Sequence, residues 1–155
     1  MEKTELFWVY AIQLERYCSY QERCKKDVIN KMIKLEVNSD MHDSLLEHLV
    51  KENMLNESRF ALSFSNGKFR YKHWGKVKIY SALSQKGINK VDVESALSQI
   101  DTEEYLEVLE HLMENKYNEI GGISEDKNKK RLLNYLLQKG YESHLIWELF
   151  KKFNY

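Results

Sequence analysis

The sequence has no proline, and its 155 residues include only six glycines and two cysteines. Proline breaks a helix interior more strongly than any other residue, so its absence leaves the chain free to form helices nearly throughout. Apolar residues recur three and four positions apart along most of the chain, which is the spacing of helices with one buried face. Strand patterns are poor. We therefore predict an all-α protein.

Long apolar runs are missing as well. No window approaches the roughly 18 consecutive apolar residues of a membrane span. The N-terminal MEKTELFWVYAIQL does not resemble a secretory signal, because acids precede its short apolar run. Cys18 and Cys24 have no second pair to complete a metal set, and free cysteines are more often small core residues than redox couples. We predict a reduced, cytoplasmic protein that does not contact membranes.

Catalytic motifs are also absent. The sequence has no glycine-rich phosphate loop, no HExxH zinc motif and no nucleophile elbow. Its histidines fall on different predicted helices without a common spacing. They are His42, His48, His73, His111 and His144. We predict that the protein is not an enzyme and has no catalytic residue, metal or cofactor.

What the sequence does contain is an uneven distribution of charge. Its 24 Lys and Arg balance its 24 Asp and Glu, which by itself argues against a nucleic-acid partner. Residues 58–91, however, include no acid, and eight Lys and Arg fall within them. We call this stretch the basic segment. Such a segment gives a neutral protein a local field that attracts polyanions.

Cations alternate with aromatic residues over residues 68–78 of the basic segment. Lys and Arg neutralise phosphates, while exposed Tyr and Trp rings stack on bases or anchor a protein interface. The amide groups that open a helix after Gly75 are expected to point outward and favour an anion. The alternative is that Phe69 and Trp74 belong to the core and the lysines are ordinary solvated surface. Arg59 has its own alternative, pairing with Glu57 or with a neighbouring helix.

A three-helix pattern occurs three times along the chain. A shift of 51 residues, followed by a further shift of 53, aligns apolar positions, helix starts and helix stops. Gly87 and Gly140 fall in one column, where a left-handed residue would end the second helix of a unit. The other columns include Val28, Ile79 and Leu132; Ile29, Tyr80 and Leu133; Met32, Leu83 and Leu136; Val37, Ile88 and Tyr141; Leu46, Leu97 and Phe150; Leu49, Ile100 and Phe153; and, as helix starts, Cys24, Gly75 and Asn128. We predict three tandem three-helix repeats, over residues 1–55, 56–100 and 101–155, in an elongated, curved array.

Local signals place several helix ends. In the first unit we predict helices over residues 5–17, with Thr4 as cap, and over residues 25–35, followed by a third helix that buries Met41, Leu45, Leu46 and Leu49. The first helices of the next two units are expected to begin after Asn56 and Asp101. Residues 121–127 are predicted to form a flexible polar loop.

Two strings in the middle of the chain resemble the signature of a known family. The first is LVKENMLNESRFA at residues 49–61, and the second is GKVKI at residues 75–79, followed by Leu83 and by KGI at residues 86–88. They are similar to the RecX family of regulators of the RecA recombinase. In that family a leucine-rich helix ends in a turn that contains Asp or Asn and an acid. Arg-Phe-Ala follows, and then a helix that begins at a glycine and closes with Lys-Gly-Ile. The resemblance spans all three repeats and is strongest in the middle one.

Some positions depart from the family pattern. Asn53 stands where glycine is common, Lys76 where proline is frequent and Cys24 where serine is common. The third repeat matches mainly through QKG at residues 138–140 and its apolar positions. These departures concern local turn geometry.

The resemblance implies a cytoplasmic regulator that acts in homologous recombination, DNA repair and the SOS response. It would bind in the groove of the RecA–DNA filament and mostly restrain ATP hydrolysis and strand exchange. The implied partners are the RecA filament and, weakly and salt-dependently, single-stranded or RecA-bound DNA, and we expect a monomer. The predicted contacts are Arg59, Lys68, Arg70, Tyr71, Lys72, Trp74, Lys76, Lys78 and Lys86.

Two other functions fit the pattern less well. Three-helix units with a basic helix resemble helix-turn-helix readers in outline, so a stand-alone helical DNA-binding protein is the main alternative. Against it, the chain is neutral and lacks the cluster of Arg, Asn and Gln on one helix face that base readout requires. A purely structural adaptor would have no affinity for DNA.

Overall fold

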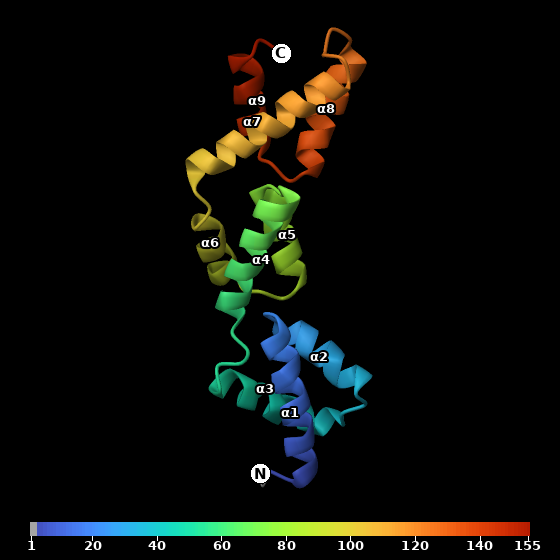
Figure 1. Cartoon of the computed structure of the whole chain (residues 1–155), viewed down its shortest axis with the longest axis vertical. Helices are drawn as coiled ribbons and strands as arrows, with labels where there is room; N and C mark the ends of the chain where they lie inside the picture. Colours follow the sequence, from blue (N-terminus) through green and yellow to red (C-terminus); the bar gives the residue numbers. More distant parts are fainter. Residues whose placement is uncertain (1–2) are drawn as a thin grey trace.

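The computed structural model describes residues 3–155, and in that range the chain forms nine α-helices, one short 3-10 turn and no strand. Figure 1 shows the helices gathered in groups of three along the long axis of the molecule, with the two termini at opposite ends. The elements are α1 (Glu5–Tyr20), α2 (Lys25–Lys34), η1 (Ser39–Met41), α3 (His42–Lys51), α4 (Glu57–Lys72), α5 (Lys76–Gln85), α6 (Lys90–Ser98), α7 (Thr102–Glu119), α8 (Asp126–Gln138) and α9 (Ser143–Lys152). The prediction of an all-α, elongated array of three-helix units is confirmed. We keep residues 1–55, 56–100 and 101–155 as the proposed limits of these units.

Three of the predicted helix starts are capped by the side chains that the sequence indicated. Thr4 Oγ1 accepts a hydrogen bond from the Phe7 amide at 3.2 Å. Asn56 Oδ1 accepts one from the Arg59 amide at 2.9 Å, and Asp101 Oδ1 accepts one from the Glu104 amide at 2.9 Å. Each cap satisfies an amide that the helix itself leaves without a partner.

Two predicted boundaries were wrong. The first helix continues to Tyr20, three residues past its predicted end. The helix predicted to start at Asn128 begins at Asp126 with Glu125 as its N-cap, so the polar loop is shorter than expected. Asn128 lies in the first turn, where its side-chain amide donates to the Ile120 carbonyl at 3.3 Å and ties α8 to the end of α7.

The predicted helix stops have the expected backbone. Gly87 has φ of +80° and Gly140 has φ of +96°, and each lies two residues after the last residue of its helix, α5 or α8. Glu36 is in the same column of the first unit, and it adopts φ of +58° although it has a side chain. All three units therefore end their second helix with a left-handed residue.

The aligned apolar columns lie in the core. The side chains of two columns, Val28, Ile79 and Leu132 and then Met32, Leu83 and Leu136, are fully buried in all three units. The column that contains Tyr80 is less regular, because the Tyr80 side chain is exposed while those of Ile29 and Leu133 are partly buried. Met41 and Leu46, which we predicted to be buried, are only partly so and pack at the edge of the first unit.

Buried residues form two separate cores. One lies within the first unit and includes Phe7, Leu14 and Leu45. The other runs without interruption through the second and third units, and Cys24 from the first unit belongs to it. The second and third units therefore share one hydrophobic core, while the first has its own.

Candidate nucleic-acid interface in the basic segment

The basic segment covers α4, the turn after it, α5 and the start of α6. Its cations do not form one continuous surface. Some surround Trp74, some lie at the end of α4, and others are used in ion pairs with neighbouring units. The predicted contacts therefore divide into groups with different environments.

Trp74 brings two of the predicted lysines together. The Nζ atom of Lys68 lies 4.8 Å from the centroid of the Trp74 ring, and that of Lys78 lies 4.5 Å from it. Phe64 packs edge-on against the same ring, and Trp74 is only half-buried. Cation–π contacts hold these two ammonium groups beside a partly accessible ring. Trp74 therefore packs on the core and also borders the surface, and its role as a contact stays a prediction.

The last turn of α4 carries the most accessible of the predicted residues. Tyr71 is 83% exposed, and Lys72 and Arg70 are exposed beside it. Phe69, in contrast, is buried against Tyr105. Of the two aromatic rings that alternate with cations at the end of α4, Phe69 is therefore buried and Tyr71 is exposed.

The amide groups at the start of α5 are not available to an anion, and that expectation was wrong. The amide of Gly75 donates to the Lys139 carbonyl at 2.7 Å, and the amide of Val77 donates to the Gly140 carbonyl at 2.9 Å. The Lys76 amide donates to the Tyr105 hydroxyl at 2.9 Å. The third unit therefore occupies the helix N-terminus that an anion would need. The Lys76 ammonium also lies over the Tyr105 ring, 4.9 Å from its centroid.

Three of the predicted contacts are paired with acids from outside the basic segment. Arg59 Nε binds Glu22 Oε1 at 2.6 Å, Lys86 Nζ lies 3.5 Å from Asp27 Oδ1, and Arg70 lies 3.4 Å from Glu104. In the described part of the chain, the cations of the predicted set without an ion pair are Lys68, Lys72, Lys76 and Lys78. The candidate interface therefore contracts to these lysines, Tyr71 and Trp74.

Sequence reasoning missed a second group of bases at the start of α8. Lys127, Lys129, Lys130 and Arg131 occupy four of five consecutive positions, and this density was the signal that could have identified them. Positive charge at a helix N-terminus opposes the helix dipole, so it adds no stability there. Lys129 Nζ donates to the Tyr155 carbonyl at 3.3 Å, while the other three make no ion pair within residues 3–155. The group lies near the C-terminal end of the array (Figure 1).

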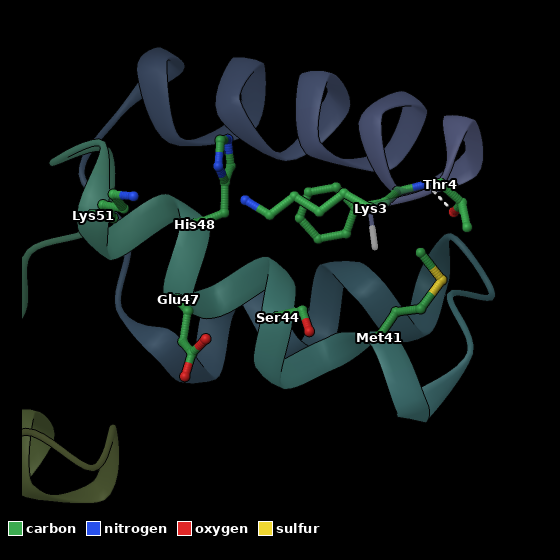
Figure 2. A pocket seen from close by; sticks show the side chains of 8 residues that line it. Lys3, Thr4, Met41, Ser44, Glu47, His48 and Lys51 are labelled. Atoms are coloured by element: carbon green, nitrogen blue, oxygen red, sulfur yellow. Dashed lines mark hydrogen bonds between the residues drawn. The ribbon is translucent and has the colours of Figure 1, made fainter. Parts of the chain in front are cut away.

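A hollow in the first unit lies away from the basic segment. Figure 2 shows it between α1 and α3. Its cavity volume is about 410 Å³. Lys3 extends over the Phe7 ring, and Lys51 and Glu47 lie at its border. His48 lines it too, and its Nε2 is 2.7 Å from Glu15 Oε1. Glu47 offsets part of the lysine charge, so the hollow does not extend the basic surface.

Both cysteines are free and buried. Burial raises the pKa of the Cys18 thiol to about 11 and also raises the pKa of Cys24. Cys18 belongs to the core of the first unit and Cys24 to the other core, which makes the core interpretation of each more apt than a redox couple.

Neither a metal cluster nor a membrane span occurs in the described chain. Residues 3–155 contain no group of three His, Cys, Asp or Glu side chains arranged to hold a metal ion. No helix in this range combines the length and the apolar character needed to cross a bilayer.

Comparisons with known proteins identify relatives for most of the chain. The family model described as the second three-helix domain of RecX matches residues 56–97, and that of the third three-helix domain matches residues 103–150. A regulatory protein RecX from Clostridium acetobutylicum is 31% identical over 150 residues, with 92% of this chain and 69% of the relative covered. One from Lactobacillus johnsonii is 28% identical, with 88% of this chain and 51% of the relative covered. The chain thus spans about half the length of several curated relatives.

Solved structures match the fold. The crystal structure of RecX from Lactobacillus salivarius superposes with a TM-score of 0.83 at 23% identity and covers 96% of both chains. A crystal structure of regulatory protein RecX gives a TM-score of 0.84 at 22% identity, covering 94% of this chain and 71% of the other. With two family models on its middle and third units and a relative above 30% identity, the chain belongs to the RecX family of regulatory proteins.

Proposed function

We propose that this protein regulates the RecA recombinase by binding along the groove of the RecA–DNA filament. It acts in the cytoplasm as a monomer and not as an enzyme, and it mostly restrains ATP hydrolysis and strand exchange during recombination and DNA repair. The observation that carries the proposal is a RecX-family chain whose elongated array presents, on its middle unit, lysines without an ion pair in the described residues, the exposed Tyr71 ring and the half-buried Trp74 ring. An elongated array suits a partner that is itself long.

The contacts of the middle unit are electrostatic in this proposal. Lys68, Lys72 and Lys78 meet DNA phosphates or an acidic surface of the filament, and Tyr71 and Trp74 anchor them. Lys76, which lies with Lys78 in the first turn of α5, adds positive charge. Holding successive RecA protomers in one arrangement would resist the changes that accompany ATP turnover, or would block filament extension.

Arg59, Arg70 and Lys86 have a smaller part in this contact. Each of them already pairs with an acid of a neighbouring unit, so a partner would have to compete with that acid. We therefore expect them to contribute less to filament binding than the lysines without an ion pair in the described chain.

The helix-turn-helix alternative finds little support in the middle unit. Its third helix, α6, is the one that would enter the major groove, and it carries Asp92 and Glu94 with a single base, Lys90. Lys90 is itself 3.8 Å from Glu94. Carboxylates on this helix repel phosphates, so sequence-specific readout by α6 is not expected.

The test is single-strand-dependent ATP hydrolysis by RecA from the same source, with this protein added below one molecule per RecA. We expect inhibition by the wild type, and loss of inhibition when Lys68, Lys72 and Lys78 are all changed to Glu. The matched control changes three exposed lysines of the first unit, Lys25, Lys34 and Lys51, to Glu, with the same change in net charge. Lack of any effect of the wild type on RecA would overturn the proposal, and equal inhibition by both triple variants would discard this surface.

A further inference from the structure

A groove lies where the end of α1 faces α4, at the junction of the first two units. Its volume is about 420 Å³. Gln21 and Glu22 line one side, and α4 lines the other along a single helical face that includes Phe64, Gly67 and Tyr71. The spacing of these α4 residues, three and four apart, puts them on one stripe of the helix.

Gly67 in this groove is not required by the fold. It lies inside a 16-residue helix, where glycine is less favourable than any residue except proline. A Cβ atom built on Gly67 would have no heavy atom within 4 Å, so no neighbour in the chain needs the space. Its effect is instead to leave the α4 backbone open toward the groove. Glycine at such a position suits the close approach of a bound group.

The chemistry around Gly67 combines an accessible ring with two cations. Tyr71, one turn later, is 83% exposed, and Lys68 and Lys72 border the groove without ion pairs in the described chain. The one acid in the lining, Glu22, is already bound to Arg59 at 2.6 Å. The groove therefore has a net positive charge, the flat face of the Tyr71 ring and an open stretch of backbone at Gly67.

We propose that this groove binds an unpaired nucleotide of a single strand, with its base on the Tyr71 ring above Gly67 and its phosphates at Lys68 and Lys72. A base in a duplex is stacked on its neighbours and cannot enter, whereas a single-stranded base can turn onto an aromatic side chain. An acidic peptide would use the lysines but would leave the opening at Gly67 and the free Tyr71 ring without a role. The inference deepens the proposed function, on which it rests for the source of the strand.

The experiment measures fluorescence anisotropy of a labelled oligodeoxythymidine of about 15 nucleotides, long enough to cover a typical single-strand site. Parallel titrations use a duplex and an abasic oligonucleotide of equal length, at low salt. We expect tighter binding of the oligothymidine than of the other two. Gly67→Leu, which fills the groove, and Tyr71→Ala should each weaken oligothymidine binding roughly tenfold, as the loss of one stacked base would.

The matched control is Asn66→Leu, at an exposed neighbouring position in α4 that does not line the groove. It should bind as the wild type does. Gly67→Leu replaces a helix-interior glycine in open space, so its thermal midpoint should rise. Weaker binding together with a higher midpoint cannot come from unfolding.

Several outcomes would overturn the inference. One is oligothymidine binding that Gly67→Leu leaves unchanged, and another is an abasic strand that binds as tightly as the oligothymidine. A third is a groove variant that binds DNA as the wild type does but fails to inhibit RecA, which would indicate that the groove binds a protein segment. The RecA assay separates the two proposals. If the wild type inhibits RecA and Gly67→Leu binds DNA as the wild type does, only the groove proposal is overturned. If DNA affinity depends on the groove but the wild type has no effect on RecA, only the proposed function is overturned.

Discussion

The two junctions of the array are built from different interactions. Between the second and third units, backbone amides of one unit donate to carbonyls of the other. A side chain on Gly75 would collide with the Gly140 backbone, and one on Gly140 would collide with Lys78. Between the first and second units, Cys24 reaches into the core of the second and third units, and the polar contacts involve side chains, such as Arg59 with Glu22 and the Lys26 ammonium with the Gln85 carbonyl at 3.0 Å. The junction of the second and third units is therefore fixed by backbone geometry, whereas that of the first and second units depends on polar contacts of flexible side chains.

This difference assigns different mechanical roles to the two ends of the molecule. Backbone contacts in a shared core do not lengthen without loss of the fold, and they are little affected by salt. Ion pairs between half-exposed side chains are weak and are screened by salt. We therefore expect the second and third units to move as one body and the first unit to adjust its orientation against them.

The largest effect is expected from Gly140→Ala. Its Cβ would lie 2.2 Å from the Lys78 Cβ, and the residue would have to keep φ at +96°. Overpacking and left-handed strain together should lower the free energy of unfolding by about 3 to 5 kcal/mol. Gly87→Ala is the matched control, because Gly87 has φ of +80° with open space around it, and it should lose only about 1 kcal/mol. Equal losses in urea unfolding would refute the close-packed junction.

Tyr105→Phe should have the next largest effect. The hydroxyl of Tyr105 accepts from the Lys76 amide at 2.9 Å and donates to the Glu142 carboxylate, and both partners would be left unpaired. The expected loss is about 1 to 3 kcal/mol in urea unfolding. Tyr135→Phe, whose hydroxyl makes no hydrogen bond in the described structure, should lose far less. A similar loss in both variants would show that the Tyr105 hydroxyl does not stabilise the junction.

High pH should weaken the same junction. Burial raises the pKa of Tyr105 above its ordinary value, and its hydrogen bond to Glu142 raises it further; burial and the nearby Glu142 charge also raise the pKa of Tyr141. The folded state thus favours the protonated phenols. Their contribution is complete below the pKa of an unfolded tyrosine, about 10, and falls as the pH rises above it.

Unfolding free energies measured from pH 8 to 11 should therefore decline more steeply for the wild type than for a Tyr105→Phe, Tyr141→Phe variant. Parallel curves would contradict this assignment.

The smallest effect is expected at the junction of the first two units. Arg59→Met should lose about 1 kcal/mol or less, because Arg59 and Glu22 are both partly exposed. The informative readout is distance rather than stability. Dyes on Ser39→Cys and Ser84→Cys report this junction, and dyes on Ser84→Cys and Ser143→Cys report the other one.

Salt of about 1 M, which reduces the Debye length to roughly 3 Å, should broaden only the first distance distribution. Broadening of both, or of neither, would remove the contrast between the junctions.

Local chemistry explains which features could be predicted from the sequence. Caps such as Asn56 and Asp101, and stops such as Gly87 and Gly140, act within a few residues, so their signals are complete in a short stretch of chain. Apolar columns are equally local, because one face of each helix must be buried wherever it docks.

The unpredicted features all depend on how distant segments dock. The acid that pairs with Arg59 is 37 residues away, and the carbonyls that occupy the start of α5 belong to a unit more than 60 residues later. A charge count over residues 58–91 finds no acid and therefore overestimates the free positive surface. Gly67 was visible in the sequence, but its significance depends on the open space around it.

The two separate cores have a consequence for the order in which the protein folds. The first unit encloses all of its buried apolar residues except Cys24, so it can become stable while the rest of the chain is still being synthesised. The second unit cannot complete its structure at that stage, because the partners for the first amides of α5 arrive only with residues 139 and 140. Folding of the last two units is therefore one cooperative step. Hydrogen exchange of the native protein should resolve two groups of protected amides, one for each core.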